Sequence, residues 1–282
     1  MLFSWTAQAH SFKIHDTGQG KAVLILAGGP AFTAWNLLPL QQHIAHKHRA
    51  LLFDMRGVGD QQQLPLPAGS LLSQWIDDIE AIRQSSSIHQ FTMIGHSWGG
   101  LMALLYAKRY PDNVKQLILL NPVDPEKRGL SEILDRINQR QQQHKPRAWD
   151  ADWDSDQSTL TKSEDEIKLY QIRQVLPTYF YDFAMGERYA AQFSANDFYP
   201  ELNSRIWQEY DAMPFTLADA KKLTPIPIRF VDCVDDLLMP ENQQGLKTHF
   251  PKMRVKLFRQ CAHFPWVEQP KVFYPWLDKA LQ

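Results

Sequence analysis

A glycine-rich turn, Gly95-His96-Ser97-Trp98-Gly99, constrains the fold of this chain more than any other feature of its sequence. The turn stands between an apolar run at 91–95 and a helical pattern at 98–109. In that context, the Gly-x-Ser-x-Gly spacing predicts a strand-to-helix turn so sharp that Ser97 is held up at the carboxyl edge of a sheet. A side chain at Gly95 or Gly99 would collide with the neighbouring strand or helix. The sequence therefore predicts a fold in which Ser97 is a candidate nucleophile, and the alternative is a glycine-rich turn with an incidental serine.

Short apolar runs recur along the first half of the chain, and helical patterns separate them. The runs occupy 22–27, 49–54, 91–95 and 114–120, and the helical patterns occupy 34–47, 71–84 and 98–109. Continuous apolar strands that alternate with helices are typical of a parallel sheet covered on both faces. An alternating segment at 11–15 predicts one antiparallel strand at the edge. We therefore expect an α/β protein with a mostly parallel central sheet.

The strand pattern stops after Leu120 and returns near residue 226. The intervening residues contain helical periodicity but no apolar strand run, with helices expected at 164–176 and 201–211 and solvated loops at 141–143 and 149–158. Strands are then expected at 226–231 and 253–258, followed by helices near 241–248 and 268–280. In a chain of 282 residues, this pattern predicts one core, formed by 1–122 and 226–282, with a helical insertion, or cap, over 123–225.

The charge of the chain is close to neutral overall but is unevenly divided. Its formal net charge is -1 and no run of Lys and Arg exceeds two residues, so it lacks the basic footprint of a nucleic-acid-binding protein. Residues 123–225 hold 18 acidic and 13 basic side chains, whereas the remainder holds 13 acidic and 17 basic ones. An acidic insertion is typical of a solvated helical surface, and the alternative is a lid that favours a cationic substrate.

The sequence gives no sign of a membrane segment or a disulfide scaffold. No stretch of 18 apolar residues occurs, and the first ten residues lack the basic start and apolar stretch of a signal peptide. Cys233 and Cys261 are too few for a disulfide framework or a zinc site, although their loops could bring them together as a redox-sensitive pair. We therefore expect a reduced, cytoplasmic protein that takes a small-molecule or short-peptide substrate and uses no metal or cofactor.

The residues that would activate Ser97 lie in the second half of the chain. A serine hydroxyl is a poor nucleophile until a base removes its proton, and in such folds an acid and then a histidine follow it in chain order. Asp235 and Asp236 follow one of the later strands, and His263 follows the last one, at the sheet edge where ligands bind. Among ten histidines, His263 is preferred because it alone lies between the last strand and the last helix.

Two assignments in this set depend on local geometry. The short loop that ends at Pro240 is expected to present either Asp235 or Asp236 to His263, and the other carboxylate to solvent or to a helix N-terminus. His96 lies beside the candidate nucleophile but is expected to point away from it, in a packing or hydrogen-bonding role.

A second glycine-rich segment, Leu26-Ala-Gly-Gly-Pro-Ala31, directly follows a predicted strand. Paired glycines let backbone N–H groups approach a reacting carbonyl, so we expect the amides of Gly29 and Trp98 to form an oxyanion hole. The alternative is a turn glycine with no other task. A phosphate-binding loop is disfavoured because neither Gly-x-Gly-x-x-Gly nor Gly-x-x-x-x-Gly-Lys is present.

Together these segments resemble the α/β-hydrolase superfamily, and within it the prolyl aminopeptidase (proline iminopeptidase) branch. That branch carries His-Gly-Gly-Pro-Gly, Asp-Gln-Arg-Gly and Gly-Gly-Ser-Trp-Gly, which match Ala27–Ala31, Asp54–Gly57 and Gly95–Gly99 here. Its acid lies four residues before a proline, which implies Asp236, and its histidine matches His263. The resemblance implies an α/β-hydrolase fold, with a mostly parallel central sheet, helices on both faces and a helical cap inserted after the sixth strand.

The chain departs from that branch at four of the matched positions. Ala27 and Ala31 replace the histidine and the last glycine of the first motif. His96 at the turn is commoner in esterase-like relatives, and Cys233 stands where a glycine usually precedes the acid. These departures keep a second kind of substrate open beside the one that the branch implies.

The resemblance implies a serine hydrolase that works through an acyl-enzyme and releases a small N-terminal residue such as proline. In that branch, cap carboxylates hold the free amine of the substrate, and Trp149 and Trp153-Asp154 loosely resemble the segment that opens the cap. The alternative is a carboxylesterase or another hydrolase of small carbonyl compounds, with a mainly apolar cap, and a third possibility is a non-catalytic binding protein. Aromatic residues that would line such a cap, or form its own core, are Tyr179, Phe180, Tyr181, Phe183, Phe193, Phe198, Tyr199 and Trp207.

Overall fold

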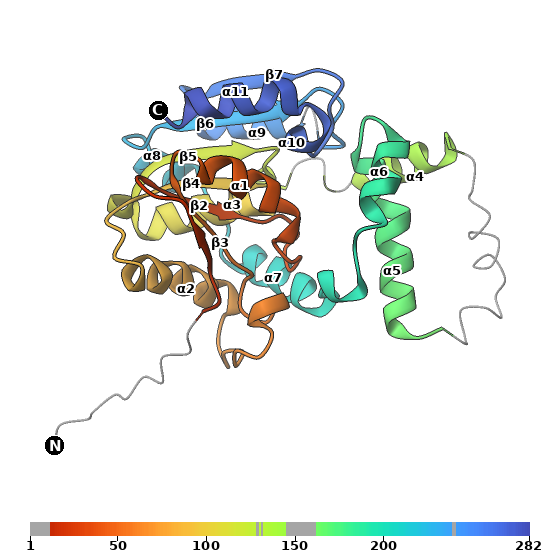
Figure 1. The fold of residues 1–282 in the computed structure, drawn as a ribbon, viewed down its shortest axis with the longest axis horizontal. Coiled ribbons are helices and arrows are strands. Elements are labelled where there is room, and N and C mark those ends of the chain that lie inside the picture. The colour runs from red at the N-terminus through yellow and green to blue at the C-terminus, as the bar shows by residue number, and fades with distance from the viewer. Residues whose placement is uncertain (1–11, 128–129, 131, 145–161, 239–240) are drawn as a thin grey trace.

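The computed structural model describes residues 12–282, except 128–129, 131, 145–161 and 239–240. Seven strands form one sheet in the order β1-β3-β2-β4-β5-β6-β7 (Figure 1). They are β1 (His15–Thr17), β2 (Ala22–Leu26), β3 (Arg49–Leu52), β4 (Phe91–His96), β5 (Val114–Leu120), β6 (Ile228–Cys233) and β7 (Arg254–Phe258). All neighbours pair in parallel except β1, which is antiparallel to β3 at the edge. The mostly parallel sheet predicted from the apolar runs is therefore confirmed.

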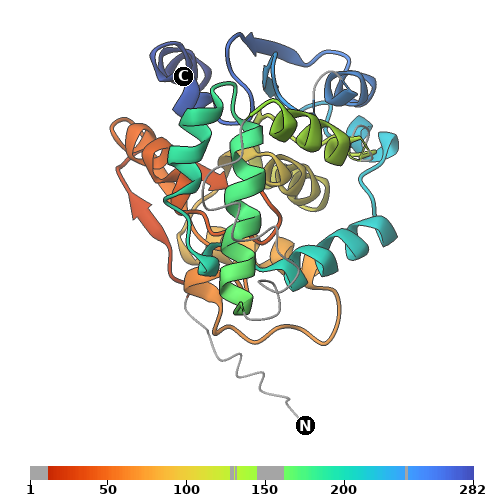
Figure 2. The ribbon, with the colours of Figure 1, turned by 90° about the vertical axis from the view of Figure 1, so that its right-hand side faces the viewer.

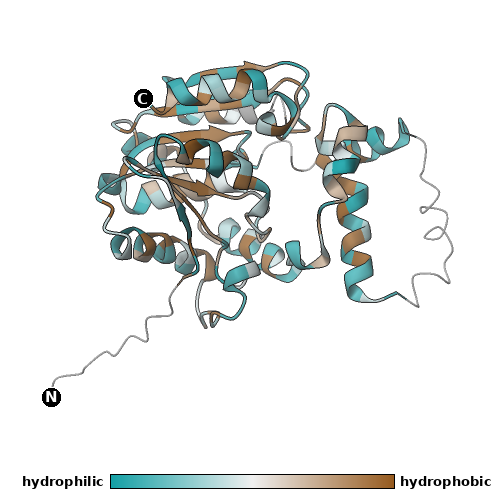
Figure 3. Cartoon of the chain, in the orientation of Figure 1, coloured by the Kyte–Doolittle hydropathy of each residue, from teal (hydrophilic) through white to brown (hydrophobic). Residues whose placement is uncertain are grey.

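Helices cover both faces of the sheet. Alternate residues of a strand point to opposite faces, and here the residues on both faces are apolar, so both faces must be buried. In β2, Leu24 and Leu26 belong to one core cluster, and Val23 and Ile25 belong to the other. The first cluster packs against α2 (Leu71–Ser85), α3 (Trp98–Arg109), α8 (Leu217–Lys222) and α9 (Glu241–His249), and the second packs against α1 (Leu38–Ala45) and α11 (Pro270–Ala280). In Figure 3 the central strands are largely brown, between helices whose outer faces are largely teal.

Local signals define where several helices begin. The Ser70 hydroxyl accepts a hydrogen bond from the Ser73 N–H at the start of α2 (3.1 Å). A short helix, α10 (Pro265–Glu268), ends just before α11, which begins at a new proline. The N-cap of α3 is Ser97, which makes no side-chain cap hydrogen bond. The Gly100 N–H donates to the Ser97 carbonyl (2.9 Å), whereas Trp98, the first residue of α3, precedes the first intrahelical hydrogen bond.

The segment between β5 and β6, called the insertion below, contains no strand among its described residues. Its helices α4 (Ile133–Gln142), α5 (Glu164–Val175) and α6 (Phe183–Ala190) stand beyond one end of the sheet, whereas α7 (Pro200–Ala212) returns beside α2 (Figures 1 and 2). The insertion follows β5, the fifth strand of the described chain, and not a sixth strand as expected. The difference arises because a single antiparallel strand, β1, precedes β2 in the described residues.

One local prediction in the insertion is wrong. Gln141 and Gln142 form the last turn of α4 and not the solvated loop expected at 141–143. Gln and Arg have good intrinsic helix propensity, but Ile137 is the only buried residue in this helix, so the apolar periodicity that predicts a helix is missing. The sequence also gave no signal for the short helices α6 and α8. The loop expected at 149–158 lies outside the described residues.

Candidate active site

Ser97 lies at the turn between β4 and α3 with backbone angles φ 53° and ψ -122°. A positive φ is uncommon for a residue with a side chain, so the surrounding structure must hold it in place. A Cβ at Gly95 would lie 2.2 Å from the carbonyl oxygen of Gly99, and a Cβ at Gly99 would lie 2.3 Å from that of Leu26. A side chain at either glycine would therefore collide with neighbouring backbone, as the sequence predicted. Ser97 itself lies at the carboxyl edge of the sheet.

His263 and Asp236 form a buried hydrogen-bonded pair at the same edge of the sheet. The Nδ1 atom of His263 lies 2.7 Å from Oδ2 of Asp236, and both side chains are almost fully buried. A carboxylate can only accept, so Nδ1 carries the proton and Nε2 is left as an acceptor. Of the two adjacent carboxylates, the structure thus places Asp236, and not Asp235, against His263.

Ser97 and His263 line one cavity of about 490 Å³. In the part of the chain that the structure describes, no hydrogen bond joins their side chains, and such contacts often tighten only when a substrate is bound. None of the described lining residues is acidic, and the polar ones besides Ser97 and the histidines are Asn36, Gln171 and Tyr179. Most of the other lining side chains are apolar: Phe32, Ile172, Leu176, Phe193, Phe198 and Phe264.

The loop after β2 brings Gly29 to this cavity, with a φ of 129° that glycine alone adopts readily. Ala31, which replaces a glycine of the resembling branch, also has a positive φ, 65°. Trp98 is the first residue of α3, so its N–H has no partner within the helix. Gly29 therefore lines the cavity that Ser97 lines, and Trp98 directly follows Ser97 in the chain.

The insertion is hydrogen-bonded to the loop that carries Gly29. The Thr33 N–H donates to the Asp197 carbonyl (3.0 Å), and the Tyr199 N–H donates to the Ala31 carbonyl (3.1 Å). These two hydrogen bonds pair the loop with the insertion in the manner of a short antiparallel bridge. The position of Gly29 thus depends on residues of the insertion.

Asn121, which the sequence analysis did not single out, contacts the Asp236 carboxylate. Its Nδ2 donates to Asp236 Oδ2 (2.7 Å), to the carbonyl of Ala262 (2.9 Å) and to Asp232 Oδ1 (3.1 Å). Asn121 follows β5 directly and has a φ of 44°, a backbone conformation that Asn tolerates better than most residues. The only feature of the sequence that could have pointed to Asn121 is its position directly after a predicted central strand.

Asp232 is a second buried carboxyl group close to Asp236. Burial, and then the nearby charge of Asp236, raise the pKa of Asp232 well above its usual range. Its Oδ1 accepts hydrogen bonds from Asn121 and from the Cys233 N–H. Burial beside Asp236 thus favours the protonated form of Asp232.

His96 hydrogen-bonds the backbone of His263 and lines the same cavity as Ser97. Its Nε2 lies 2.9 Å from the His263 carbonyl oxygen, which can only accept, so Nε2 carries the proton. Burial, and then the neighbouring His263, lower the pKa of His96 well below its usual range. His96 is therefore a neutral donor, in the hydrogen-bonding role expected for it.

Glu268 fixes the backbone on both sides of His263. Its Oε1 accepts the N–H groups of Ala262 (3.0 Å) and Phe264 (3.2 Å), and its Oε2 accepts the N–H of Tyr181 in the insertion (2.7 Å). Burial is the main cause of a raised pKa at Glu268, and these three hydrogen bonds oppose it. Sequence reasoning, which used only the position of the last strand here, did not predict this role of Glu268.

Cys233 and Cys261 form a buried disulfide. Cys233 ends β6, three residues before Asp236, and Cys261 lies two residues before His263. The disulfide differs from the reduced pair expected from the cysteine count, because the two loops lie side by side at the sheet edge. It joins covalently the segments that present the acid and the histidine.

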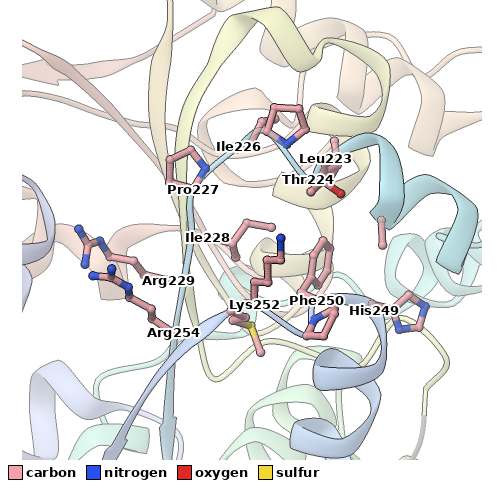
Figure 4. Close-up of a pocket in the computed structure, with 14 residues that line it drawn as sticks. Leu223, Thr224, Ile226, Pro227, Ile228, Arg229, His249, Phe250, Lys252 and Arg254 are labelled. Carbon is pink, nitrogen blue, oxygen red and sulfur yellow. The ribbon is translucent and has the colours of Figure 1, made fainter.

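A second cavity, of about 520 Å³, lies at the opposite ends of β6 and β7 (Figure 4). Ile228 and Phe250 are among its lining residues, and Arg229 and Arg254 lie side by side on adjacent strands. The residues that line it do not include Ser97, Asp236 or His263. Ligands bind at the carboxyl ends of strands in open α/β sheets, so the cavity at Ser97 is the candidate active site.

The described residues contain no group of three or more His, Cys, Asp and Glu side chains arranged to hold a metal ion. None of their helices is both long and apolar enough to span a membrane.

Comparison with protein families gives one match over most of the chain. Residues 21–270 match the sequence model of the alpha/beta hydrolase fold family. The match begins just before β2 and ends at the start of α11, so it contains every candidate residue described above.

The chain is similar to named proteins of more than one kind. The chain is 22% identical to a proline iminopeptidase of Heyndrickxia coagulans, over 93% of this chain and 90% of that protein. It is 32% identical to a 2-hydroxymuconate semialdehyde hydrolase of Pseudomonas sp. strain CF600, over 38% of each chain. Among solved structures, a meta-cleavage product hydrolase from Pseudomonas fluorescens IP01 superposes with a TM-score of 0.70 at 19% identity, over 95% of this chain and 93% of that chain. At that identity, the superposition shows a shared fold.

Proposed function

Because this chain belongs to the alpha/beta hydrolase family and is a hydrolase, we propose that it acts through a catalytic triad of Ser97, His263 and Asp236. The observation that carries the proposal is the 2.7 Å hydrogen bond between His263 Nδ1 and Asp236 Oδ2, at the cavity that Ser97 also lines. This hydrogen bond fixes the tautomer in which Nε2 of His263 can accept a proton. The order of the three residues along the chain is the one that this fold uses.

The proposed reaction passes through an acyl-enzyme. Ser97 Oγ attacks the substrate carbonyl while His263 Nε2 takes the hydroxyl proton, and Asp236 stabilises the imidazolium that forms. The same proton then passes to the leaving group, the carbonyl bond to that group breaks, and the acyl group remains on Ser97. Water, deprotonated by His263, attacks this ester. The bond to Ser97 Oγ then breaks, His263 returns the proton to Ser97 Oγ, and the acid is released. The chemistry of these steps requires only the side chains and water.

The amides of Gly29 and Trp98 are the proposed donors to the oxyanion. A tetrahedral intermediate carries negative charge on the former carbonyl oxygen, and each N–H aimed at it contributes about 3 kcal/mol in enzymes of this kind. Both amides belong to backbone that is fixed before substrate arrives: Gly29 in the loop bonded to the insertion, and Trp98 in the first turn of α3. Fixed donors cost no reorganisation during the reaction.

The lining of the cavity favours an uncharged, apolar acyl group. We propose that the insertion, residues 123–225, acts as a cap that contributes Ile172, Phe193 and Phe198 to this lining. A substrate ammonium would need a carboxylate partner here, because an unpaired charge is costly in an apolar site, and none of the described lining residues is acidic. The geometry therefore supports a carboxylesterase or another hydrolase of small carbonyl compounds best.

An aminopeptidase is the second candidate, because one set of observations favours it. The proline iminopeptidase relative matches over 93% of this chain, whereas the semialdehyde hydrolase relative matches over 38%. The insertion is also acidic overall. The residues that loosely resemble the amine-binding segment, Trp149 and Trp153-Asp154, lie outside the described residues.

A substrate panel separates these candidates. Short acyl nitrophenyl esters and prolyl and alanyl arylamides are offered to the wild-type protein, and kcat/KM is compared. Turnover of esters with little turnover of arylamides supports the first candidate, and strong turnover of prolyl arylamide supports the second.

The Ser97→Ala variant tests the triad itself. We expect it to lose nearly all turnover and all labelling by a fluorophosphonate, while its unfolding temperature stays close to that of the wild type. Full turnover in this variant would contradict the proposed mechanism. If the wild-type protein shows neither turnover nor labelling of Ser97, it is a binding protein on a hydrolase fold.

A further inference from the structure

Two arginines of the insertion contact the loop that carries Asp236. Arg136 and Arg140 lie four residues apart on α4, and therefore on one face of that helix. Arg136 Nη1 donates to the carbonyl of Leu237 (2.5 Å), and Arg140 Nη2 donates to the carbonyl of Asp235. These carbonyls belong to the residues immediately before and after Asp236, so the two guanidinium groups hold its backbone from both sides.

Arg140 also contacts the segment that holds His263. Its Nη1 donates to the carbonyl of Thr178 (2.5 Å), in the short helical turn that follows α5. The carbonyl of the next residue, Tyr179, accepts the N–H of His263 (3.0 Å). One guanidinium group therefore connects the Asp236 loop to the segment on which the His263 backbone rests.

The charge of Arg140 is directed at these carbonyls. Among the described residues, no carboxylate forms an ion pair with Arg140, and its side chain is half-buried. Burial lowers the pKa of Arg140, and the nearby Asp236 and Asp235 oppose that shift, but a guanidinium stays protonated in proteins. Its planar fork can reach two carbonyls at once, which the single ammonium of a lysine does less well.

We propose that Arg140 is a positioning residue for the triad, since it joins the loop of Asp236 to the segment of the insertion that holds His263. This inference rests on the triad proposed above. Through Arg140, the insertion would help to set the distance between His263 and Asp236, in addition to lining the cavity. Misplacement of catalytic groups by about 1 Å can cost about 100-fold in rate, so a residue that fixes both loops has a measurable effect.

The Arg140→Gln variant tests this role through the kinetic constants. We expect kcat on the best ester substrate to fall about tenfold while KM changes less than about twofold, because the lost contacts set the geometry of the triad and not the lining of the cavity. Arg140→Lys keeps the charge but lacks the fork, and should restore part of kcat. Arg254→Gln, at the far ends of the strands, and Asn138→Ala, on the opposite face of α4, are the matched controls and should match the wild type.

A double-mutant cycle shows whether Arg140 acts through Asp236. With Asp236→Asn already present, Arg140→Gln should change the rate on an activated ester by less than about twofold, because residues that act as one unit are not additive. If the tenfold loss persists in that background, or if Arg140→Gln alone stays within twofold of the wild type, the proposal is wrong. Should the glutamine variant fail to fold, the lysine variant is used in the same cycle.

A spectroscopic readout needs no turnover and separates this proposal from the proposed function. The proton between His263 Nδ1 and Asp236, in a short hydrogen bond, should give a far-downfield ¹H NMR signal that disappears in Asp236→Asn. We expect this signal to shift or broaden in Arg140→Gln and to stay unchanged in Arg254→Gln. An unchanged signal in Arg140→Gln would overturn the positioning role even if Ser97 proves not to be the nucleophile.

Discussion

His96 donates a hydrogen bond from Nε2 to the backbone carbonyl of His263, 2.9 Å away. The residue before the candidate nucleophile thus holds the backbone of the candidate base, although 167 residues separate the two. The same His263 residue rests on the Tyr179 carbonyl through its N–H. Both polar groups of its backbone are therefore satisfied by segments far away in the sequence.

Replacing His96 with Phe keeps an aromatic ring but leaves the His263 carbonyl buried without a partner. An unsatisfied buried acceptor costs about 1–3 kcal/mol, so we expect the free energy of unfolding to fall by about that amount and kcat to fall with it. Denaturant titration and steady-state kinetics measure the two effects. His96→Gln, which retains an N–H donor, is the control and should recover part of both, and a fully active His96→Phe would contradict the holding role.

Asn121→Leu removes the amide that donates to Asp236 Oδ2 while keeping a side chain of similar size. Hydrogen bonds to charged groups contribute about 1.5–3 kcal/mol, so kcat/KM is expected to fall about tenfold or more, with the main change in kcat. The comparison variant is Asn121→Asp, which places another acid beside Asp236 and Asp232 and should be less stable than the wild type above pH 6. Activity within twofold of the wild type in Asn121→Leu would show that Asp236 is held by other groups.

The raised pKa of Asp232 predicts how stability depends on pH. In the folded protein, Asp232 retains its proton at pH values where the unfolded chain has released it. The folded state therefore binds more protons, and the contribution of Asp232 makes stability fall as pH rises above about 4, until the folded pKa is passed. Asp232→Asn removes this contribution, because the amide does not titrate and its oxygen can still accept from Asn121.

The measurement for Asp232 is the free energy of unfolding of both proteins between pH 4 and pH 8. We expect the free energy of unfolding of Asp232→Asn to increase relative to that of the wild type as pH increases. A difference that is constant over this range would mean that Asp232 titrates alike in the folded and unfolded chains.

Removing the disulfide should lower stability more than it lowers activity. The two cysteines are 28 residues apart, and closing a loop of that size contributes roughly 3.5 kcal/mol in the chain-entropy account. The double variant Cys233→Ala/Cys261→Ala is therefore expected to unfold at a lower denaturant concentration. Its kcat should stay within about threefold of the wild type because Asn121, Glu268 and His96 still hold the Asp236 and His263 loops. Equal stability in the double variant would contradict a structural role for this bond.

Much of the core was predictable because it follows from short-range patterns. The continuous apolar runs gave the parallel strands, and the glycines around Ser97 gave the turn, since both depend on neighbours within a few residues. The loops of Asp236 and His263 followed from chain order. The helix predicted at 98–109 coincides with α3 for the same reason. Its buried residues follow the turn directly in sequence, so a short-range pattern was enough to predict it.

The groups that contact the proposed triad could not be predicted in this way, because they act across long sequence distances. Asn121 meets Asp236 after 115 residues, and Arg140 meets Asp235 after 95 residues. Neither interaction leaves a periodic signal near the residue itself. Asp232 lies in β6, whose apolar run is also interrupted by Arg229, so the sequence does not distinguish it. Its raised pKa depends on burial and on Asp236, which lies outside that strand.

The bridge between the Gly29 loop and residues 197–199 limits how this scaffold could be redesigned. A change of substrate range is most simply sought by exchanging the insertion for one from another hydrolase. Here, however, Asn203 also donates to the Pro30 carbonyl (2.8 Å), so the anchoring segment extends to residue 203. A chimaera that replaces α4 to α6 but retains residues 197–203 would keep the Gly29 loop in its native register. One that replaces the whole insertion would have to rebuild that loop as well.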